Sequence, residues 1–223
     1  MKVMIERFGF LLCALTLTLF LSACSDPAAD KEEAKVQDAV EIPETTEAGG
    51  EDAAPVEIEG TKYVMDPSIS SITFTGSKVS GTHSGGWSKY ECTVIVPDGD
   101  FTKAAIVIDF DMTSTFSDDT DLTDTLKSDK IFDVATYPTA KFVSTSIEGS
   151  DGEYRVSGNF TLHGVTKNIT FTADVELEDD SLIAEADFSI NRKDFNVNYD
   201  GLADDLIREK VVLLFYVEGS PAE

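Results

Sequence analysis

The chain has 223 residues, and its 42 Asp and Glu against 17 Lys and Arg give a formal net charge of −25 at pH 7. A field this negative repels phosphate backbones, so nucleic acid is excluded as a partner. It also repels anionic lipid headgroups, so attachment to a membrane calls for a covalent anchor rather than electrostatic binding at the surface.

The first segment has the pattern of an export signal. Lys2 and Arg7 precede an apolar run over residues 8–21, which is too short to span a bilayer comfortably. The run ends in Leu-Ser-Ala-Cys, which resembles the lipobox where bacterial lipoprotein signal peptidase cleaves before a lipidated cysteine. We expect residues 1–23 to be a lipoprotein signal peptide, and Cys24 to carry the acyl chains, palmitate among them, that anchor the protein to a membrane.

The residue after the anchor indicates a destination. In Gram-negative bacteria, a residue other than Asp after the lipidated cysteine favours transport to the outer membrane, and here that residue is Ser25. We therefore expect the protein on the periplasmic face of the outer membrane. The alternative to the lipobox is an ordinary signal-peptide cleavage site, with Cys24 beside it by chance.

Residues 24–61 have the composition of a linker. After the cysteine they hold twelve Asp and Glu, two Lys and three Pro, with few large apolar side chains. Burial of so few apolar groups does not offset the entropy of ordering, so we expect a disordered acidic tether that holds the following domain away from the membrane. A short helix around residues 31–40 is the alternative, and it leaves that role unchanged.

From residue 62 onward, apolar and polar side chains alternate with the period of two that is typical of half-buried strands. Eight or nine strands are expected, the clearest at 106–112, 155–162, 168–177 and 184–191, with others at 63–66, 70–79, 87–97, 139–147 and 207–218. Only residues 117–137 lack this alternation, and we expect a short helix within them, over 121–127.

Short connections rich in Gly, Asp and Ser join these strands, as at 98–100, 149–152 and 178–181. Neighbouring strands should therefore pair antiparallel in an up-and-down meander. Closing eight such strands into a barrel removes the exposed edges, although a two-sheet sandwich fits the periodicity equally well. An eight-stranded barrel is either just filled by side chains or able to hold one small ligand.

The expected inner face is rich in Phe and carries no charge. It consists of Phe74, Ile106, Ile108, Phe110, Phe142, Phe160, Leu162, Phe171, Phe188, Ile190 and Phe215. Such a wall suits a hydrocarbon ligand. The same residues also suit a solid core with no ligand, and alternation alone gives the two interpretations equal weight.

Little in the sequence points to catalysis. No Gly-x-Ser-x-Gly, His-Glu-x-x-His or phosphate-loop motif occurs. His83 and His163 lie in expected turns, and Cys92 lies on an expected strand without a neighbouring His. We expect no catalytic residue, no metal and no cofactor. The alternatives are a metal site or a base acting on a lipid at the two histidines, and a Ca²⁺ site in the acidic run 118–124.

Several motifs in a fixed order resemble the YceI-like family. They are Tyr-Val-Met-Asp-Pro-Ser at 63–68, Gly-Thr-His-Ser-Gly-Gly-Trp at 81–87, Leu-Lys-Ser-Asp-Lys-Ile-Phe-Asp at 126–133 followed by Tyr-Pro, Gly-Asn-Phe-Thr-Leu-His-Gly-Val-Thr-Lys at 158–167, and Ile-Asn-Arg-Lys-Asp-Phe at 190–195. Two positions depart from the pattern: Pro67 replaces a His, and Asn196 replaces a Gly.

This resemblance implies a lipocalin-like antiparallel β-barrel over residues 62–223, exported to the periplasm. Relatives hold a polyisoprenoid or an isoprenoid quinone-like molecule lengthwise, so the inner face above becomes the expected ligand lining. Each five-carbon unit contributes roughly 3–4 kcal/mol of gross transfer free energy. We expect a membrane-anchored binding protein for transport, storage or stress protection, whose partners are this apolar ligand and the membrane. A ligand-free interaction or stress-protection lipoprotein with a solid barrel is the alternative.

Overall fold

A computed structural model describes residues 26–42 and 58–222. The expectations for the signal peptide, for Cys24 and for Ser25 lie outside these residues. In the described part of the chain, no helix has both the length and the apolar character that crossing a membrane requires.

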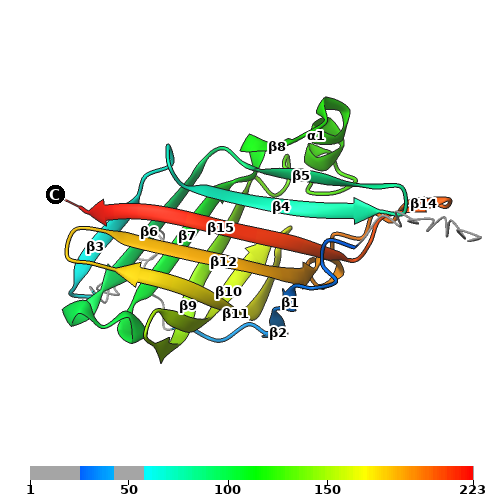
Figure 1. The fold of residues 1–223 in the computed structure, drawn as a ribbon. Helices are drawn as coiled ribbons and strands as arrows, with labels where there is room; N and C mark the ends of the chain where they lie inside the picture. Colours follow the sequence, from blue (N-terminus) through cyan, green and yellow to red (C-terminus); the bar gives the residue numbers. More distant parts are fainter. Residues whose placement is uncertain (1–25, 43–57, 223) are drawn as a thin grey trace, which may run out of the picture.

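The barrel wall is an up-and-down meander of eight antiparallel strands (Figure 1). Its first three strands are each broken in two, and its last five are continuous. In chain order the segments are β3 (Thr61–Met65), β4 (Ser71–Lys78), β5 (Gly81–Trp87), β6 (Tyr90–Val96), β7 (Ala105–Asp111), β8 (Thr115–Ser117), β9 (Thr139–Ser150), β10 (Glu153–Leu162), β11 (Val165–Leu177), β12 (Leu182–Asn191) and β15 (Lys210–Pro221).

The last strand closes the barrel. β15 pairs with β12 on one side, and with both β3 and β4 on the other. No sheet edge is therefore left between the first and last strands. The prediction of an eight-stranded antiparallel barrel is confirmed, and the sandwich is not formed. The expected short helix is also present, as α1 (Thr120–Lys127), which begins where the Asp119 side chain accepts a hydrogen bond from the Leu122 amide.

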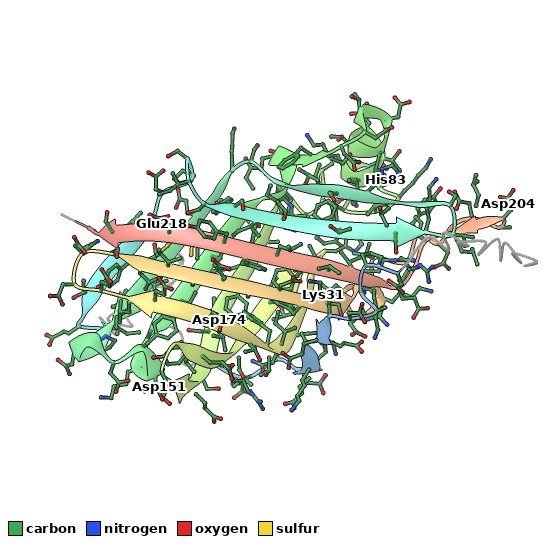
Figure 2. All side chains as sticks on the ribbon, viewed as in Figure 1. Lys31, His83, Asp151, Asp174, Asp204 and Glu218 are labelled. Carbon is green, nitrogen blue, oxygen red and sulfur yellow. The ribbon has the colours of Figure 1, made fainter. Side chains whose placement is uncertain are left out.

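The two ends of the barrel differ. At one end, here called the mouth, α1 and a small hairpin of β13 (Gly201–Leu202) and β14 (Asp205–Leu206) project beyond the wall (Figure 1). Figure 2 shows Asp204 at this end and Asp151 and Glu218 at the other. Short 3-10 turns lie in three further connections, at Pro97–Gly99 and Phe101–Lys103, at Met112–Ser114, and at Arg192–Phe195.

Part of the expected linker is built into the wall. β1 (Glu32–Glu33) pairs parallel with β12, and β2 (Lys35–Asp38) pairs antiparallel with β11 (Figure 1). Between them, Ala34 is buried and its amide donates to the Ser189 carbonyl. We call residues 32–38 the strap.

The strap lies where two neighbouring barrel strands separate. β11 and β12 pair with each other only over residues 174–177 and 182–185, so beyond that point each has unpaired backbone groups. Those groups need hydrogen-bond partners, and the strap supplies them for residues 167–170 of β11 and 188–189 of β12. The prediction of a disordered tether is therefore wrong for residues 32–38, because composition does not reveal a partner that lies about 150 residues later in the chain.

Candidate ligand cavity

The mouth half of the barrel is hollow. A cavity of about 400 Å³ lies there, between α1, the β13–β14 hairpin and the inner faces of β4, β5, β12 and β15. This volume is within the range of roughly 300–1,000 Å³ that is typical of small-molecule sites. Of the predicted lining residues, Phe74, Phe160, Leu162 and Ile190 line this mouth cavity.

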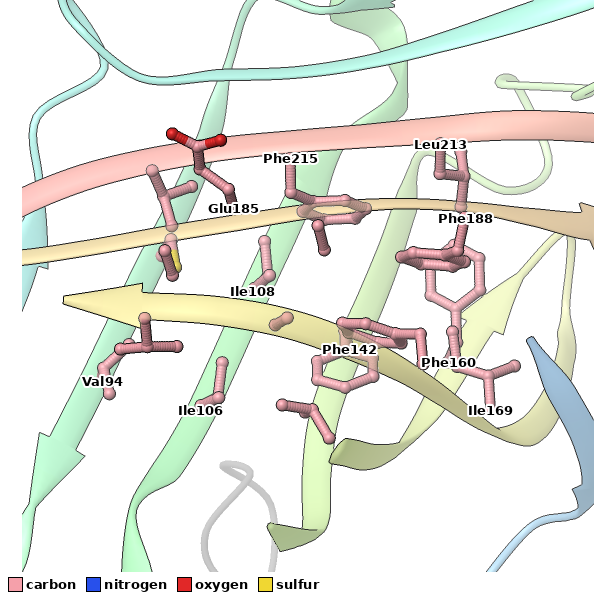
Figure 3. A pocket seen from close by; sticks show the side chains of 18 of the residues that line it. Val94, Ile106, Ile108, Phe142, Phe160, Ile169, Glu185, Phe188, Leu213 and Phe215 are labelled. Carbon is pink, nitrogen blue, oxygen red and sulfur yellow. The ribbon is translucent and has the colours of Figure 1, made fainter. Parts of the chain in front are cut away.

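The other half of the barrel is almost filled. Its cavity measures about 60 Å³ and is enclosed by Phe rings and aliphatic side chains, with Glu185 also among the lining residues (Figure 3). Phe171 and Phe188 stack with ring centroids 4.2 Å apart, and the Phe215 ring lies 5.9 Å from that of Phe188. Beyond them, Phe101 packs on Tyr154 with centroids 4.8 Å apart and covers the closed end.

All of the predicted lining residues lie inside the barrel. Those on the small cavity are Ile106, Ile108, Phe110, Phe142, Phe160, Phe171, Phe188 and Phe215, so Phe160 lies between the two cavities and borders both. The interpretation of a ligand-holding barrel thus fits the mouth half, and that of a solid core fits the other half. Contact of these side chains with a ligand stays a prediction.

The sequence did not point to the cover of the mouth cavity. Leu126 of α1, with Ile131 and Phe132 of the following turn, is buried and lines this cavity, and Phe132 packs edge-on against Phe74 at 6.3 Å. These three residues lie outside the alternating strands, so periodicity did not select them. Their place in the most specific family motif was the available signal.

The buried guanidinium of Arg192 holds the loop of residues 197–208 in place, on the side of the mouth away from α1. Arg192 is 6% exposed, and its guanidinium donates to the carbonyl oxygens of Val197, Ile207 and Arg208 and to the Asp200 carboxylate. Every contact ties residues 197–208 to the end of β12. Hydrogen bonds, first from Lys193 and then from Arg192, hold the pKa of Asp200 below its usual value, so this support persists in mild acid.

Two polar atoms in the cavity wall are unsatisfied. Ser77 Oγ and Trp87 Nε1 are buried without a hydrogen-bond partner among the described residues, and both residues line the mouth cavity. The Trp87 ring packs between Phe74 and Phe110, with centroid distances of 5.4 and 5.2 Å. A buried donor without an acceptor is costly, so a ligand with an acceptor oxygen fits this wall better than a pure hydrocarbon.

The two histidines have different surroundings. His83 lines the mouth cavity, and its Nδ1 lies 2.9 Å from Asp118, whose carboxylate also accepts from the Ser84 amide. The latter bond is the main reason that the pKa of Asp118 is lowered. His163 lies in the β10–β11 turn, 4.6 Å from the Tyr137 ring, and borders neither cavity. Within the described ranges, no three His, Cys, Asp or Glu form a group suited to a metal ion.

Cys92 is expected to be unreactive in the folded protein. It is 4% exposed on β6, and burial raises the pKa of its thiol to about 12. At pH 8 we expect an aromatic disulfide reagent to modify Cys92 only after unfolding in guanidinium, in a protein of residues 25–223, which lacks Cys13 and Cys24. Rapid modification without denaturant would show that Cys92 is accessible. Because the folded pKa lies above the unfolded one, the thiol should also reduce stability as the pH rises from about 9 towards 12.

The chain is similar in sequence and in fold to known proteins. Residues 63–219 match the model of the YceI-like domain. Protein YceI of Salmonella arizonae and that of Salmonella newport are each 37% identical to the chain over 101 residues, which are 42% of this chain and 51% of theirs. The chain therefore matches about half the length of these curated relatives.

Solved structures share the fold. BcnA of Burkholderia cenocepacia superposes with a TM-score of 0.61 at 20% identity, covering 69% of this chain and 98% of BcnA. A polyisoprenoid binding domain from Saccharophagus degradans gives a TM-score of 0.59 at 18% identity, covering 72% and 98%. The YceI protein of Campylobacter jejuni gives 0.53 at 17%, covering 80% and 94%.

Proposed function

The chain belongs to the YceI-like domain family, and from this membership we propose that it is a lipoprotein that holds an isoprenoid or similar apolar molecule in its barrel, for transport, storage or stress protection. The observation that carries the proposal is the apolar mouth cavity of about 400 Å³. The Saccharophagus degradans neighbour, named for polyisoprenoid binding, supports the same ligand class. We further propose that lipid on Cys24 anchors the protein at the periplasmic face of the outer membrane.

The volume of the cavity limits how much ligand it holds. If each carbon group fills roughly 30 Å³, about the share of one water molecule in the liquid, the 400 Å³ of the mouth cavity hold about thirteen carbon groups. That is two to three isoprene units, with roughly 6–12 kcal/mol of gross transfer free energy before ordering costs. A longer chain needs Phe160 to turn aside, because this ring borders both cavities.

The unsatisfied indole of Trp87 suggests how the ligand is oriented. An alcohol or quinone oxygen near Trp87 Nε1 would accept a hydrogen bond from this buried donor. The apolar chain would then lie against Phe74, Leu162 and Ile190.

Trp87→Phe should weaken binding of an oxygen-bearing ligand by about three- to tenfold, because it removes the Nε1 donor and keeps an aromatic ring. Affinity for farnesol and for the hydrocarbon farnesene, both measured by calorimetry, separates the hydrogen bond from the smaller ring. Farnesene should lose much less affinity than farnesol. Equal losses for the two ligands would contradict a hydrogen bond from Trp87.

The decisive experiment is detergent-free native mass spectrometry of residues 25–223, secreted behind an ordinary cleavable signal peptide in place of residues 1–24, followed by organic extraction. A stoichiometric apolar adduct is the expected result. Trp87 is the only tryptophan and lines the cavity, so its fluorescence reports uptake of added farnesol or of an isoprenoid quinone. A chain that purifies empty and takes up neither compound would favour the ligand-free interaction lipoprotein.

A further inference from the structure

We infer that the mouth of the barrel rests against the bilayer that anchors the protein, so that ligand passes between membrane and cavity without crossing water. This inference rests on the proposed function and on the lipid anchor at Cys24. Three observations carry it: where Asp26 lies, how the strap is held, and which side chains are exposed at the rim of the mouth.

Asp26, two residues after Cys24 in the sequence, lies beside the mouth. The Asp26 carboxylate lies 3.4 Å from Nη1 of Arg208, whose amide donates to the Ser77 carbonyl at 2.8 Å. Ser77 and Ile207 both line the mouth cavity. Only two residue steps separate Cys24 from Asp26, a reach of at most about 7 Å. Lipid on Cys24, as proposed above, would therefore be attached within this reach of Asp26 and so near the opening.

The strap prevents the linker from acting as a long tether. Its backbone pairs with β11 and β12, and three ion pairs reinforce it. Lys31, the residue just before the strap, pairs with Asp187, while Glu33 pairs with Lys210 at 2.8 Å and Asp38 with Lys167 at 3.0 Å. Residues that follow the strap lie between it and β3, so they add no length between the anchor and the barrel.

The rim of the mouth exposes aliphatic side chains. Val79 in the β4–β5 turn is 60% exposed, and Leu202 and Leu206 of the β13–β14 hairpin are 67% and 49% exposed. The two turns are joined, because the Val79 amide donates to the Leu206 carbonyl at 3.2 Å. An exposed apolar rim around an apolar cavity suits the boundary between lipid headgroups and acyl chains.

Charge at the rim is partly neutralised, despite the net charge of −25. Lys78 pairs with Asp205 at 2.7 Å, and Arg208 pairs with Asp26. These pairs reduce the repulsion between this end of the barrel and anionic headgroups, although Asp204 and the acidic side chains of α1 also lie there. The lipid bilayer is therefore the partner that we assign to this surface.

Orientation can be tested without any ligand. The lipidated full chain is reconstituted in vesicles of phosphatidylethanolamine with one quarter phosphatidylglycerol, and a bimane label is placed by Leu202→Cys or, as the matched control, by Val64→Cys on β3. Val64 is 45% exposed, and Cys92 is buried, so only the new cysteine should react. Quenchers attached to the lipids should reach the label at 202 and leave the label at 64 unaffected. Equal quenching at both positions, or none at 202, overturns the inference.

Transfer provides a second test, which separates this inference from the proposed function. A flexible insert of fifteen Gly and Ser residues between Ser25 and Asp26 lengthens the segment that joins Cys24 to the barrel and leaves the cavity unchanged. The quenching of Trp87 fluorescence measures uptake of an isoprenoid quinone from the same vesicles, and we expect this uptake to slow about tenfold. The affinity for farnesol in solution should stay at the parent value. Unchanged uptake with unchanged affinity contradicts the membrane-facing mouth alone. If neither protein binds farnesol, the proposed function itself fails.

Discussion

A Gly76→Phe variant should lose at least about a hundredfold of its affinity for farnesol and still fold like the parent. Gly76 lines the mouth cavity, and a Cβ atom built on it meets no heavy atom within 4 Å. It lies two residues after the inward-facing Phe74 on β4, so its side chain points to the same face. A phenyl group there takes the room of several ligand carbons, and losing four carbon contacts at about 0.8 kcal/mol each exceeds this factor.

The chain offers a matched control for this substitution. Gly81 also has no heavy atom within 4 Å of a built Cβ, and it starts β5 outside the set of residues that line the cavity. Gly81→Phe should therefore bind farnesol like the parent, as measured by quenching of Trp87. Retained affinity in Gly76→Phe would mean that the ligand occupies another part of the molecule.

Phe188→Ala should lower the free energy of unfolding by about 3–5 kcal/mol, the usual cost of truncating a buried Phe. Phe188 is 1% exposed, stacks on Phe171 at 4.2 Å, and lies on β12 opposite Glu32 of the strap. Its loss therefore leaves a hole where the barrel is filled. For a domain of this size the midpoint of thermal unfolding should fall by roughly 10 °C.

Phe116→Ala is the comparison for Phe188→Ala, because the Phe116 ring is 43% exposed on β8. Urea and thermal unfolding of the two variants should differ clearly, with the smaller change for Phe116. If Phe188→Ala unfolds at the parent's midpoint, the closed half of the barrel is not packed as described.

Much of the wall could be predicted from the sequence, because a strand with one buried face shows a period of two. That rule selects Phe160, Phe171 and Phe188 as inward residues, and all three lie inside the barrel. It could not show which half of the barrel is hollow. That outcome depends on how bulky rings from separate strands meet, as in the stack of Phe171, Phe188 and Phe215.

Two other features were beyond periodicity and composition. The lining contains Arg192, a charge that an apolar lining pattern excludes and that the fold satisfies with carbonyl oxygens from a later loop. The strap has an acidic composition typical of disorder, but its stability comes from the separated edges of β11 and β12. In both cases the deciding partners are far away in the sequence, so no local rule detects them.

The strap also fixes an order of events during folding. It lies near the N-terminus, so it reaches the periplasm early in the proposed export route. Glu32 cannot pair, however, until Phe188, near the other end of the chain, is in place. Closing so long a loop is slow compared with forming the neighbouring hairpins of the meander. In the proposed lipoprotein, lipid could hold the N-terminus in the membrane throughout this delay. The barrel would then assemble first and dock onto its own anchored segment as the last step of maturation.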